Sequence, residues 1–154
     1  MILKGASTYN NALNFIKENE GGPFLKAYQD SNKVWTIGWG STFHFDKERQ
    51  VQNNDIITFK QAQKWLELQT GKDAIEIKKI VKIPLTNNEL NSLISFVYNI
   101  GINAFKKSTF LKLLNNKIDK KLVANEFDKW IYDNGKINKG LINRRNAEKS
   151  LFLS

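Results

Sequence analysis

The sequence predicts an α+β fold that is mostly helical and carries one small antiparallel β-hairpin. From residue 58 onward, apolar residues recur at the spacing of helices that bury one face. Between residues 27 and 40, β-branched and aromatic residues flank a polar turn instead, which is typical of a hairpin. We expect one domain over residues 1–154, a length at which a chain can bury a core of its own.

The first predicted helix covers residues 10–19, because Leu13 and Ile16 lie at helical spacing. Gly21 and Gly22 should end it, which leaves Glu20 at its carboxyl terminus. That end of a helix presents partial negative charge and favours the protonated form of an acid. A protonated carboxyl group suits general-acid catalysis, although a glutamate considered alone is more often a plain surface residue.

The predicted hairpin pairs Ala27-Tyr28 with residues 34–40 across a turn at residues 30–33. Asp30 stands at the entrance of the turn and Thr36 in the returning strand, close enough to share a water molecule. An acid at a helix end and a second acid in a wet turn can hold different protonation states. Glycoside hydrolysis requires such a pair of carboxyl groups.

Further helices follow, with capping boxes at their starts. Residues 42–55 predict a short strand or an irregular segment. A capping box at Thr58 and Gln61 begins a long helix to Val81, with Thr70-Gly71 as a candidate kink. A second box at Thr86 and Glu89 begins an apolar helix that Gly101 ends.

The last third of the chain predicts a short helix over residues 108–114, a helix over 120–130, a loop at 133–135 and a final helix over 141–152. The final helix carries Arg144 and Arg145 near its start. By default we interpret these arginines as a solvated helix face. Core packing accounts for the four tryptophans at least as well as sugar binding does, so we assign none of them to binding.

Charge and composition limit the classes of function. Lys and Arg number 24 against 15 Asp and Glu, a net charge of +9, which favours a polyanionic partner. With no cysteine and His44 as the single histidine, we expect no metal site, and we interpret His44 as a loop residue. No apolar run reaches the ~20 residues of a membrane span or the length of a signal peptide, so we expect a cytoplasmic protein without a membrane span.

Glu20 and the segments 25–30 and 35–40 resemble the catalytic signature of the phage-type lysozymes, the endolysin muramidases of glycoside hydrolase family 24. The resemblance continues in the same order to Phe152, through residues 99–101, 104–105, 108–109, 140–148 and 151–152. One extra residue lies between Glu20 and Asp30, within residues 21–23. Ser41 stands where many relatives have histidine.

The resemblance implies a two-lobed lysozyme fold with an active-site cleft between the lobes. Residues 20–57 would form a small β-containing lobe and residues 58–82 a linking helix. Residues 83–154, with the amino-terminal helix, would form the helical lobe. No cofactor or metal is implied, and we expect a monomer.

The resemblance also implies the reaction, the hydrolysis of the β-1,4 bond between N-acetylmuramic acid and N-acetylglucosamine in peptidoglycan. Glu20 would be the general acid, and Asp30 and Thr36 would orient water for an inverting displacement. Tyr98, Asn99 and Ser108 would contact the substrate.

Arg144 would support Glu20 in the free enzyme. The protein would wait in the bacterial cytoplasm and reach the wall through a holin or after lysis. Anionic wall polymers are further candidate partners.

Two other classes of function stay open from the residues alone. The charge of +9 and the lysine-rich helices at 72–82 and 106–121 are compatible with a nucleic-acid-binding module. Their basic residues form no recognised motif, so we expect no specific nucleic acid. A wall-binding protein without turnover is the other alternative, and the intact set of Glu20, Asp30 and Thr36 argues against it.

Overall fold

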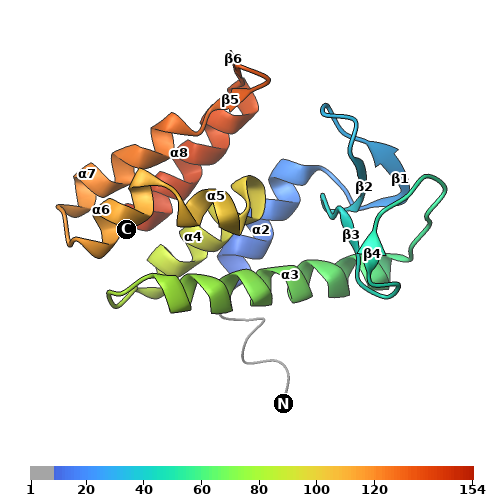
Figure 1. Ribbon diagram of the computed structural model, residues 1–154, viewed down its shortest axis with the longest axis horizontal. Coiled ribbons are helices and arrows are strands. Elements are labelled where there is room, and N and C mark those ends of the chain that lie inside the picture. Colours follow the sequence, from blue (N-terminus) through green and yellow to red (C-terminus); the bar gives the residue numbers. More distant parts are fainter. Residues whose placement is uncertain (1–8) are drawn as a thin grey trace. The chain divides into compact units, whose positions relative to one another are not determined.

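The computed structural model of the protein describes residues 9–154. These form two compact units: residues 16–69, called the β unit here, and residues 70–154 with the described residues before Ile16, called the helical unit. The boundaries fall within two helices, α2 (Asn10–Glu20) and α3 (Phe59–Ile80) (Figure 1). The mostly helical α+β fold class is confirmed.

The β unit contains the predicted hairpin. Strands β1 (Phe24–Gln29) and β2 (Trp35–Gly38) pair antiparallel, with Tyr28 opposite Thr36. A second hairpin, β3 (Phe43–His44) and β4 (Arg49–Gln50), lies in the segment predicted to be a strand or irregular. The buried apolar residues of this unit are Ile16, Ala27, Ile37, Trp39, Val51, Ile57, Ala62, Trp65 and Leu66.

Helix α3 begins at the predicted capping box. The hydroxyl of Thr58 accepts from the backbone N–H of Gln61 at 3.1 Å, and the Gln61 side chain accepts from the Thr58 N–H at 2.9 Å. Two donors of the first turn are thereby satisfied. The helix runs without a break through Thr70 and Gly71, so this pair does not interrupt it.

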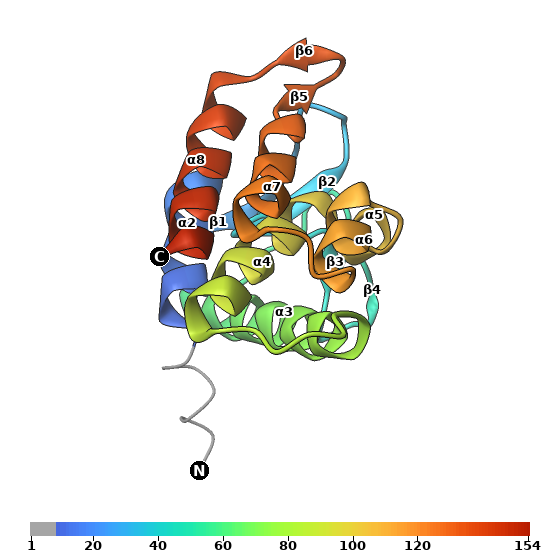
Figure 2. The same cartoon turned by 90° about the vertical axis from the view of Figure 1, so that its left-hand side faces the viewer.

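The helical unit is a set of packed helices: α4 (Asn87–Ile100), α5 (Ile102–Lys106), α6 (Thr109–Asn115), α7 (Lys120–Ala124), the 3₁₀ helix η1 (Asn125–Lys129) and α8 (Lys139–Leu153). Helix α8 packs along α4 on one side and along η1 on another (Figure 2). Thr86 caps α4, as its sequence predicts, by accepting from the Glu89 N–H at 3.1 Å.

The core of the helical unit is built from phenylalanines. Phe110 lies at its centre, with ring centroids 4.7 Å from Phe127, 5.4 Å from Phe96, 5.8 Å from Phe105 and 6.0 Å from Phe152. Most of these rings meet edge to face, the arrangement that aromatic quadrupoles favour. Four different helices are thus joined through one residue of α6.

Two predictions for this unit are wrong in detail. The helix predicted over residues 120–130 changes from α to 3₁₀ at Asn125. The segment predicted as a loop at 133–135 belongs to a small hairpin, β5 (Tyr132–Asp133) and β6 (Lys136–Ile137), in which Asn134-Gly135 forms the turn. The Asn134-Gly135 pair was its signal, because both residues adopt the positive φ that a two-residue hairpin turn requires.

Candidate functional site

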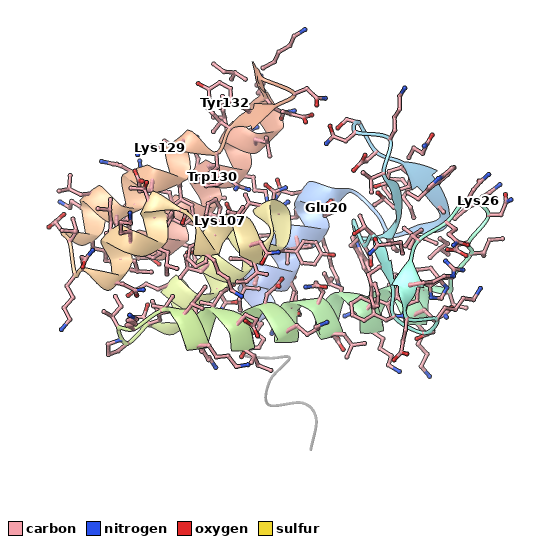
Figure 3. All side chains as sticks on the ribbon, in the orientation of Figure 1. Glu20, Lys26, Lys107, Lys129, Trp130 and Tyr132 are labelled. Carbon is pink, nitrogen blue, oxygen red and sulfur yellow. The ribbon has the colours of Figure 1, made fainter. Side chains whose placement is uncertain are left out.

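Glu20 lies at the end of α2, as predicted (Figure 3). Gly21 follows with φ of 76°, a left-handed conformation that ends the helix at little cost for glycine. The Glu20 carboxylate lies directly against Gly40, since a Cβ added at Gly40 would be 2.5 Å from Oε2. Gly40 thereby leaves the space in which the carboxylate sits.

Tyr28 of β1 interacts electrostatically with two acids of the β unit, Glu20 and Asp30. Burial, and then the negative charges of Glu20 and Asp30, raise the pKa of Tyr28 above its ordinary value. Its backbone partner across the hairpin is Thr36. One tyrosine is therefore within electrostatic range of both predicted catalytic carboxylates.

Asp30 and Thr36 are held by the same residue, Val34. The Asp30 carboxylate accepts through Oδ1 from the backbone N–H groups of Val34 at 2.9 Å and Asn32 at 2.8 Å. The hydroxyl of Thr36 donates to the carbonyl of Val34 at 2.9 Å. These contacts fix one oxygen of Asp30 and the hydrogen of Thr36, and they leave Asp30 Oδ2 and the Thr36 lone pairs as acceptors.

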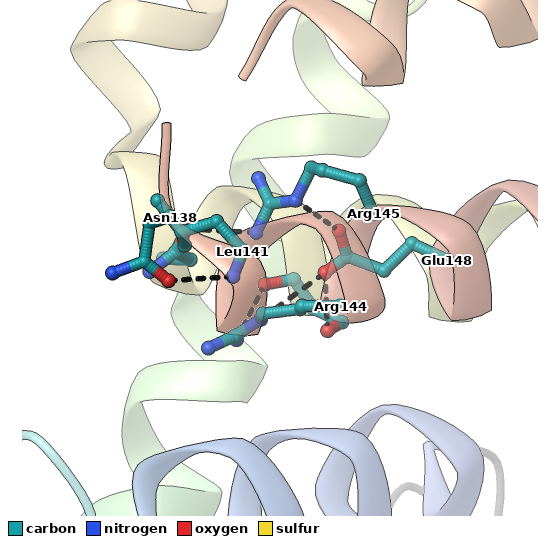
Figure 4. A network of polar contacts seen from close by, with 7 residues as sticks. Asn138, Leu141, Arg144, Arg145 and Glu148 are labelled. Atoms are coloured by element: carbon teal, nitrogen blue, oxygen red, sulfur yellow. Dashed lines mark hydrogen bonds and ion pairs between the residues drawn. The ribbon is translucent and has the colours of Figure 1, made fainter. Parts of the chain in front are cut away.

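Arg144 and Arg145 are buried, with 3% and 0% of their surfaces exposed, so their interpretation as a solvated face is wrong. Both pair with Glu148 on the same helix (Figure 4). Arg144 also donates to the carbonyl of Ser95 at 3.0 Å, and the Ser95 hydroxyl donates to Glu148 at 2.6 Å. The predicted support of Glu20 by Arg144 stays a prediction.

Burial shifts the pKa values of two members of this network, Arg145 and Glu148. Burial lowers the pKa of Arg145 to about 10, against the opposing charge of Glu148, so the guanidinium is cationic at neutral pH. Burial also raises the pKa of Glu148, and the charges of Arg145 and Arg144 oppose that shift. Arg145 lies over Phe96, with its guanidinium carbon 4.8 Å from the ring centroid.

The three predicted substrate-binding residues have different surroundings within the helical unit. Tyr98 is partly buried and Asn99 is exposed at the end of α4, where Arg145 donates to the Asn99 side chain at 2.7 Å. Ser108 caps α6: its hydroxyl accepts from the Leu111 N–H at 3.1 Å and donates to the Phe105 carbonyl at 2.7 Å. These bonds explain a serine at this position by structure alone.

His44 is part of strand β3 and is buried, so its interpretation as a loop residue is wrong. Its ring lies 4.7 Å from Trp65, and its Nδ1 accepts from the Lys47 N–H at 3.3 Å. Across residues 9–154, no cluster of three or more His, Cys, Asp or Glu side chains could hold a metal ion. Nor does any helix in that range have the length and apolar character of a membrane span.

Sequence reasoning predicted Glu20, Asp30 and Thr36 as catalytic residues, and all three lie in the β unit. It did not identify three residues that contact predicted site residues. Gly40 lies against the Glu20 carboxylate, and the backbone of Val34 binds the side chains of Asp30 and Thr36. Of these two residues, only Gly40 stands in a distinctive sequence pattern, the Gly-Trp-Gly run. Glu148 stands three and four residues after the two arginines, a spacing that predicts helical ion pairs.

Comparison with known proteins identifies the family of the chain. The family model described as "Phage lysozyme" matches residues 17–148 of the chain. The endolysin of Bacillus phage PZA is 38% identical over 144 residues, which cover 92% of this chain and 53% of that protein. The chain thus spans about half the length of that relative.

Two solved structures extend the likeness to the whole fold. An endolysin from the Escherichia coli phage FAHEc1 has a TM-score of 0.80 and 35% identity, covering 94% of this chain and 91% of its own. The muramidase domain of SpmX from Asticaccaulis excentricus has a TM-score of 0.77 and 31% identity, covering 93% and 95%. The fold is a lysozyme fold, and the chain belongs to the phage lysozyme family.

Proposed function

We propose that the protein is a peptidoglycan-hydrolysing lysozyme that cleaves the β-1,4 bond between N-acetylmuramic acid and N-acetylglucosamine. The observation that supports the proposal is that the Glu20 carboxylate lies against Gly40, which closely follows the hairpin that carries Asp30 and Thr36, in a chain of the phage lysozyme family. The names of its relatives, endolysin and muramidase, support the same reaction.

In the proposed reaction, Glu20 donates its proton to the glycosidic oxygen while the bond from that oxygen to the anomeric carbon breaks. A water molecule attacks the opposite face of the sugar. Asp30 Oδ2 accepts one hydrogen of that water, and the Thr36 hydroxyl oxygen accepts the other. These atoms are the acceptors because Asp30 Oδ1 and the Thr36 hydroxyl hydrogen are already bonded to the backbone of Val34. The proton that water loses goes to Asp30, and the product has inverted configuration.

The proposed roles of Asp30 and Thr36 depend on preorganisation. Both side chains are fixed by backbone groups of the same turn before any substrate binds. A water held by two fixed acceptors needs little reorganisation at the moment of attack. Tyr98 and Asn99 are proposed to contact the glycan, and Arg144 is proposed to support Glu20.

Release of reducing sugar from purified peptidoglycan tests the function, with Glu20→Gln as the principal variant. This change keeps the shape of the side chain and removes the transferable proton. We expect wild-type hydrolysis and a loss of roughly 10²- to 10⁴-fold in the variant. Glu18→Gln is the matched control, because Glu18 is an exposed glutamate of the same helix and should keep wild-type activity.

Three outcomes would contradict parts of this proposal. Activity that survives in folded Glu20→Gln but not in Glu18→Gln would move the general acid to Glu18. Wall binding by a wild type that releases no sugar would favour a binding protein. Proton NMR of the first product gives the anomeric configuration, and a retained anomer would assign Asp30 a nucleophilic role instead.

The proposed cellular route follows from the same assignment. The protein accumulates in the host cytoplasm as a monomer and meets the wall after a holin opens the membrane. Fractionation of cells that express the chain with and without a holin tests this route, with lysis expected only when both are present.

A further inference from the structure

Asn99 and Arg145 form a contact that joins the surface of the helical unit to its interior. Asn99 is exposed at the end of α4, whereas Arg145 on α8 has no exposed surface. The Arg145 Nη2 donates to Asn99 Oδ1 at 2.7 Å. An exposed amide is thereby fixed by a buried cation.

The hydrogen bond from the Arg145 guanidinium group determines the orientation of the Asn99 side-chain amide. A guanidinium group has only donors, so Asn99 must turn its oxygen toward Arg145. The amide NH₂ is then directed away from Arg145, at the exposed end of the residue. Asn99 therefore presents hydrogen-bond donors, and a ligand that binds it must offer an acceptor oxygen.

Arg145 itself has little freedom to move. Its Nε lies 2.9 Å from Glu148 Oε1, and its guanidinium lies over the ring of Phe96. Glu148 is held in turn by the Ser95 hydroxyl at 2.6 Å and by Arg144 Nε at 3.4 Å. The position of the Asn99 amide is thus set by residues of two packed helices, α4 and α8.

Stability alone is a weak reason for this network. Buried ion pairs lose solvation that their attraction often fails to restore, and apolar replacements of similar volume are frequently neutral or stabilising. Arg145 Nη1 is buried without a hydrogen bond to any described residue, which adds to the cost. A contribution to binding would account for keeping a cation here.

We propose that Arg145 is a positioning residue, which orients the Asn99 amide as a donor to an acceptor oxygen of the glycan, such as the carbonyl of an N-acetyl group. This inference rests on the proposed function and extends it from the residues that touch substrate to one that does not. Neither Arg145 nor its contact with Asn99 is required by the acid and base chemistry of the β unit.

The test separates donor from positioning with two variants. Asn99→Asp keeps an oxygen for Arg145 and removes the NH₂ donor, whereas Arg145→Met keeps the amide and removes its anchor. KM, kcat and Tm are measured for both, for the double variant and for the wild type, on soluble glycan strands. Asn146→Ala, at an exposed asparagine of α8, is the matched control.

We expect each single variant to raise KM roughly tenfold with kcat changed less than about threefold, as for the loss of one hydrogen bond in substrate binding. The double variant should be no worse than either single one, because both changes remove the same contact. Arg145→Gln, which retains a neutral donor, should restore part of the affinity.

Two results would overturn the proposal: an Arg145→Met protein with lowered Tm and wild-type KM, or single effects that multiply in the double variant. If Arg145→Met fails to fold, the same comparison is made with Arg145→Gln. Titration of the variants with the glycan strands gives binding without turnover. A wild type that binds strands but releases no sugar contradicts the proposed hydrolysis, while the variants still decide the role of Arg145.

Discussion

Gly40 and Glu20 are so close that no larger residue fits between them. A Cβ at Gly40 would lie 2.5 Å from Glu20 Oε2 and 2.9 Å from the carboxyl carbon, and φ at Gly40 is 81°. We expect Gly40→Ala to displace the carboxylate, to lower kcat roughly 100-fold and to cost about 1 kcal/mol or more in stability. Sugar-release kinetics and chemical denaturation measure the two effects.

Gly71 provides the matched control for that substitution. It lies inside α3, and a Cβ added there would meet nothing within 4 Å. Alanine favours a helix interior over glycine by about 1 kcal/mol, so Gly71→Ala should raise stability and leave kcat unchanged. A Gly40→Ala protein with wild-type kcat would show that Glu20 does not depend on this close contact.

The catalytic candidates could be predicted from sequence because their signals are local. Glu20 is placed by the glycine that ends its own helix, and Asp30 and Thr36 by a hairpin of a dozen or so residues. The contact of Arg145 with Asn99 joins residues 46 positions apart. It exists only because α4 packs along α8, and no periodicity within either helix specifies its partner.

At the scale of elements, an ion pair joins strand β4 of the second hairpin to the segment that follows it. Strands β3 and β4 have two residues each, but Arg49 makes two 2.8 Å bonds to Asp55, which also accepts from the Gln52 N–H at 2.8 Å. The sequence segment 42–55 has no alternation that predicts this pairing. The bidentate contact between Arg49 and Asp55 depends on the folded arrangement, so a local sequence pattern does not predict it.

The same ion pair predicts how stability depends on pH. The hydrogen bonds from Arg49, followed by that from Gln52, hold the pKa of Asp55 well below its usual range. Because folding lowers this pKa, the unfolded chain takes up the proton first as the pH falls. The contribution of Asp55 is therefore complete above the ordinary carboxylate pKa, near 4, and is lost progressively below it.

Asp55→Asn should accordingly lower Tm at pH 7, and the difference from wild type should shrink as the pH falls from about 4 toward 2. Thermal unfolding at a series of pH values measures this. Asp128→Asn is the control, because Asp128 pairs with Lys149 at 2.7 Å but is half exposed and should contribute little. A Tm difference for Asp55→Asn that stays constant with pH would contradict the linkage.

At the scale of the whole chain, folding of the helical unit depends on its phenylalanine core. Phe110 is 1% exposed and contacts rings from α4, α5, η1 and α8. Phe110→Ala should lower the free energy of unfolding by about 3–5 kcal/mol through lost transfer energy and the cavity left behind. Chemical denaturation should show this loss.

Tyr132→Ala is the control for the core substitution, since this aromatic residue is 58% exposed in the same unit. Its effect on the free energy of unfolding should stay within about 0.5 kcal/mol. An equal loss in both variants would indicate that aromatic content rather than burial decides stability. That result would contradict the proposal that the helices of this unit depend on one buried phenylalanine core.

The net charge of +9 gives the last prediction, which concerns the whole molecule and an anionic wall. Lys60, Lys112 and Lys121 are exposed helix residues, and changing all three to glutamate lowers the formal charge from +9 to +3. Attraction between distant charges falls with ionic strength, because the Debye length shrinks from about 10 Å at 0.1 M to about 3 Å at 1 M. We expect the triple variant to hydrolyse whole walls more slowly at low salt, and to match wild type at high salt or on uncharged soluble glycan strands. Equal loss on uncharged strands would show that these lysines act on catalysis or folding, and equal rates on walls at low salt would show that the basic surface does not attract the wall.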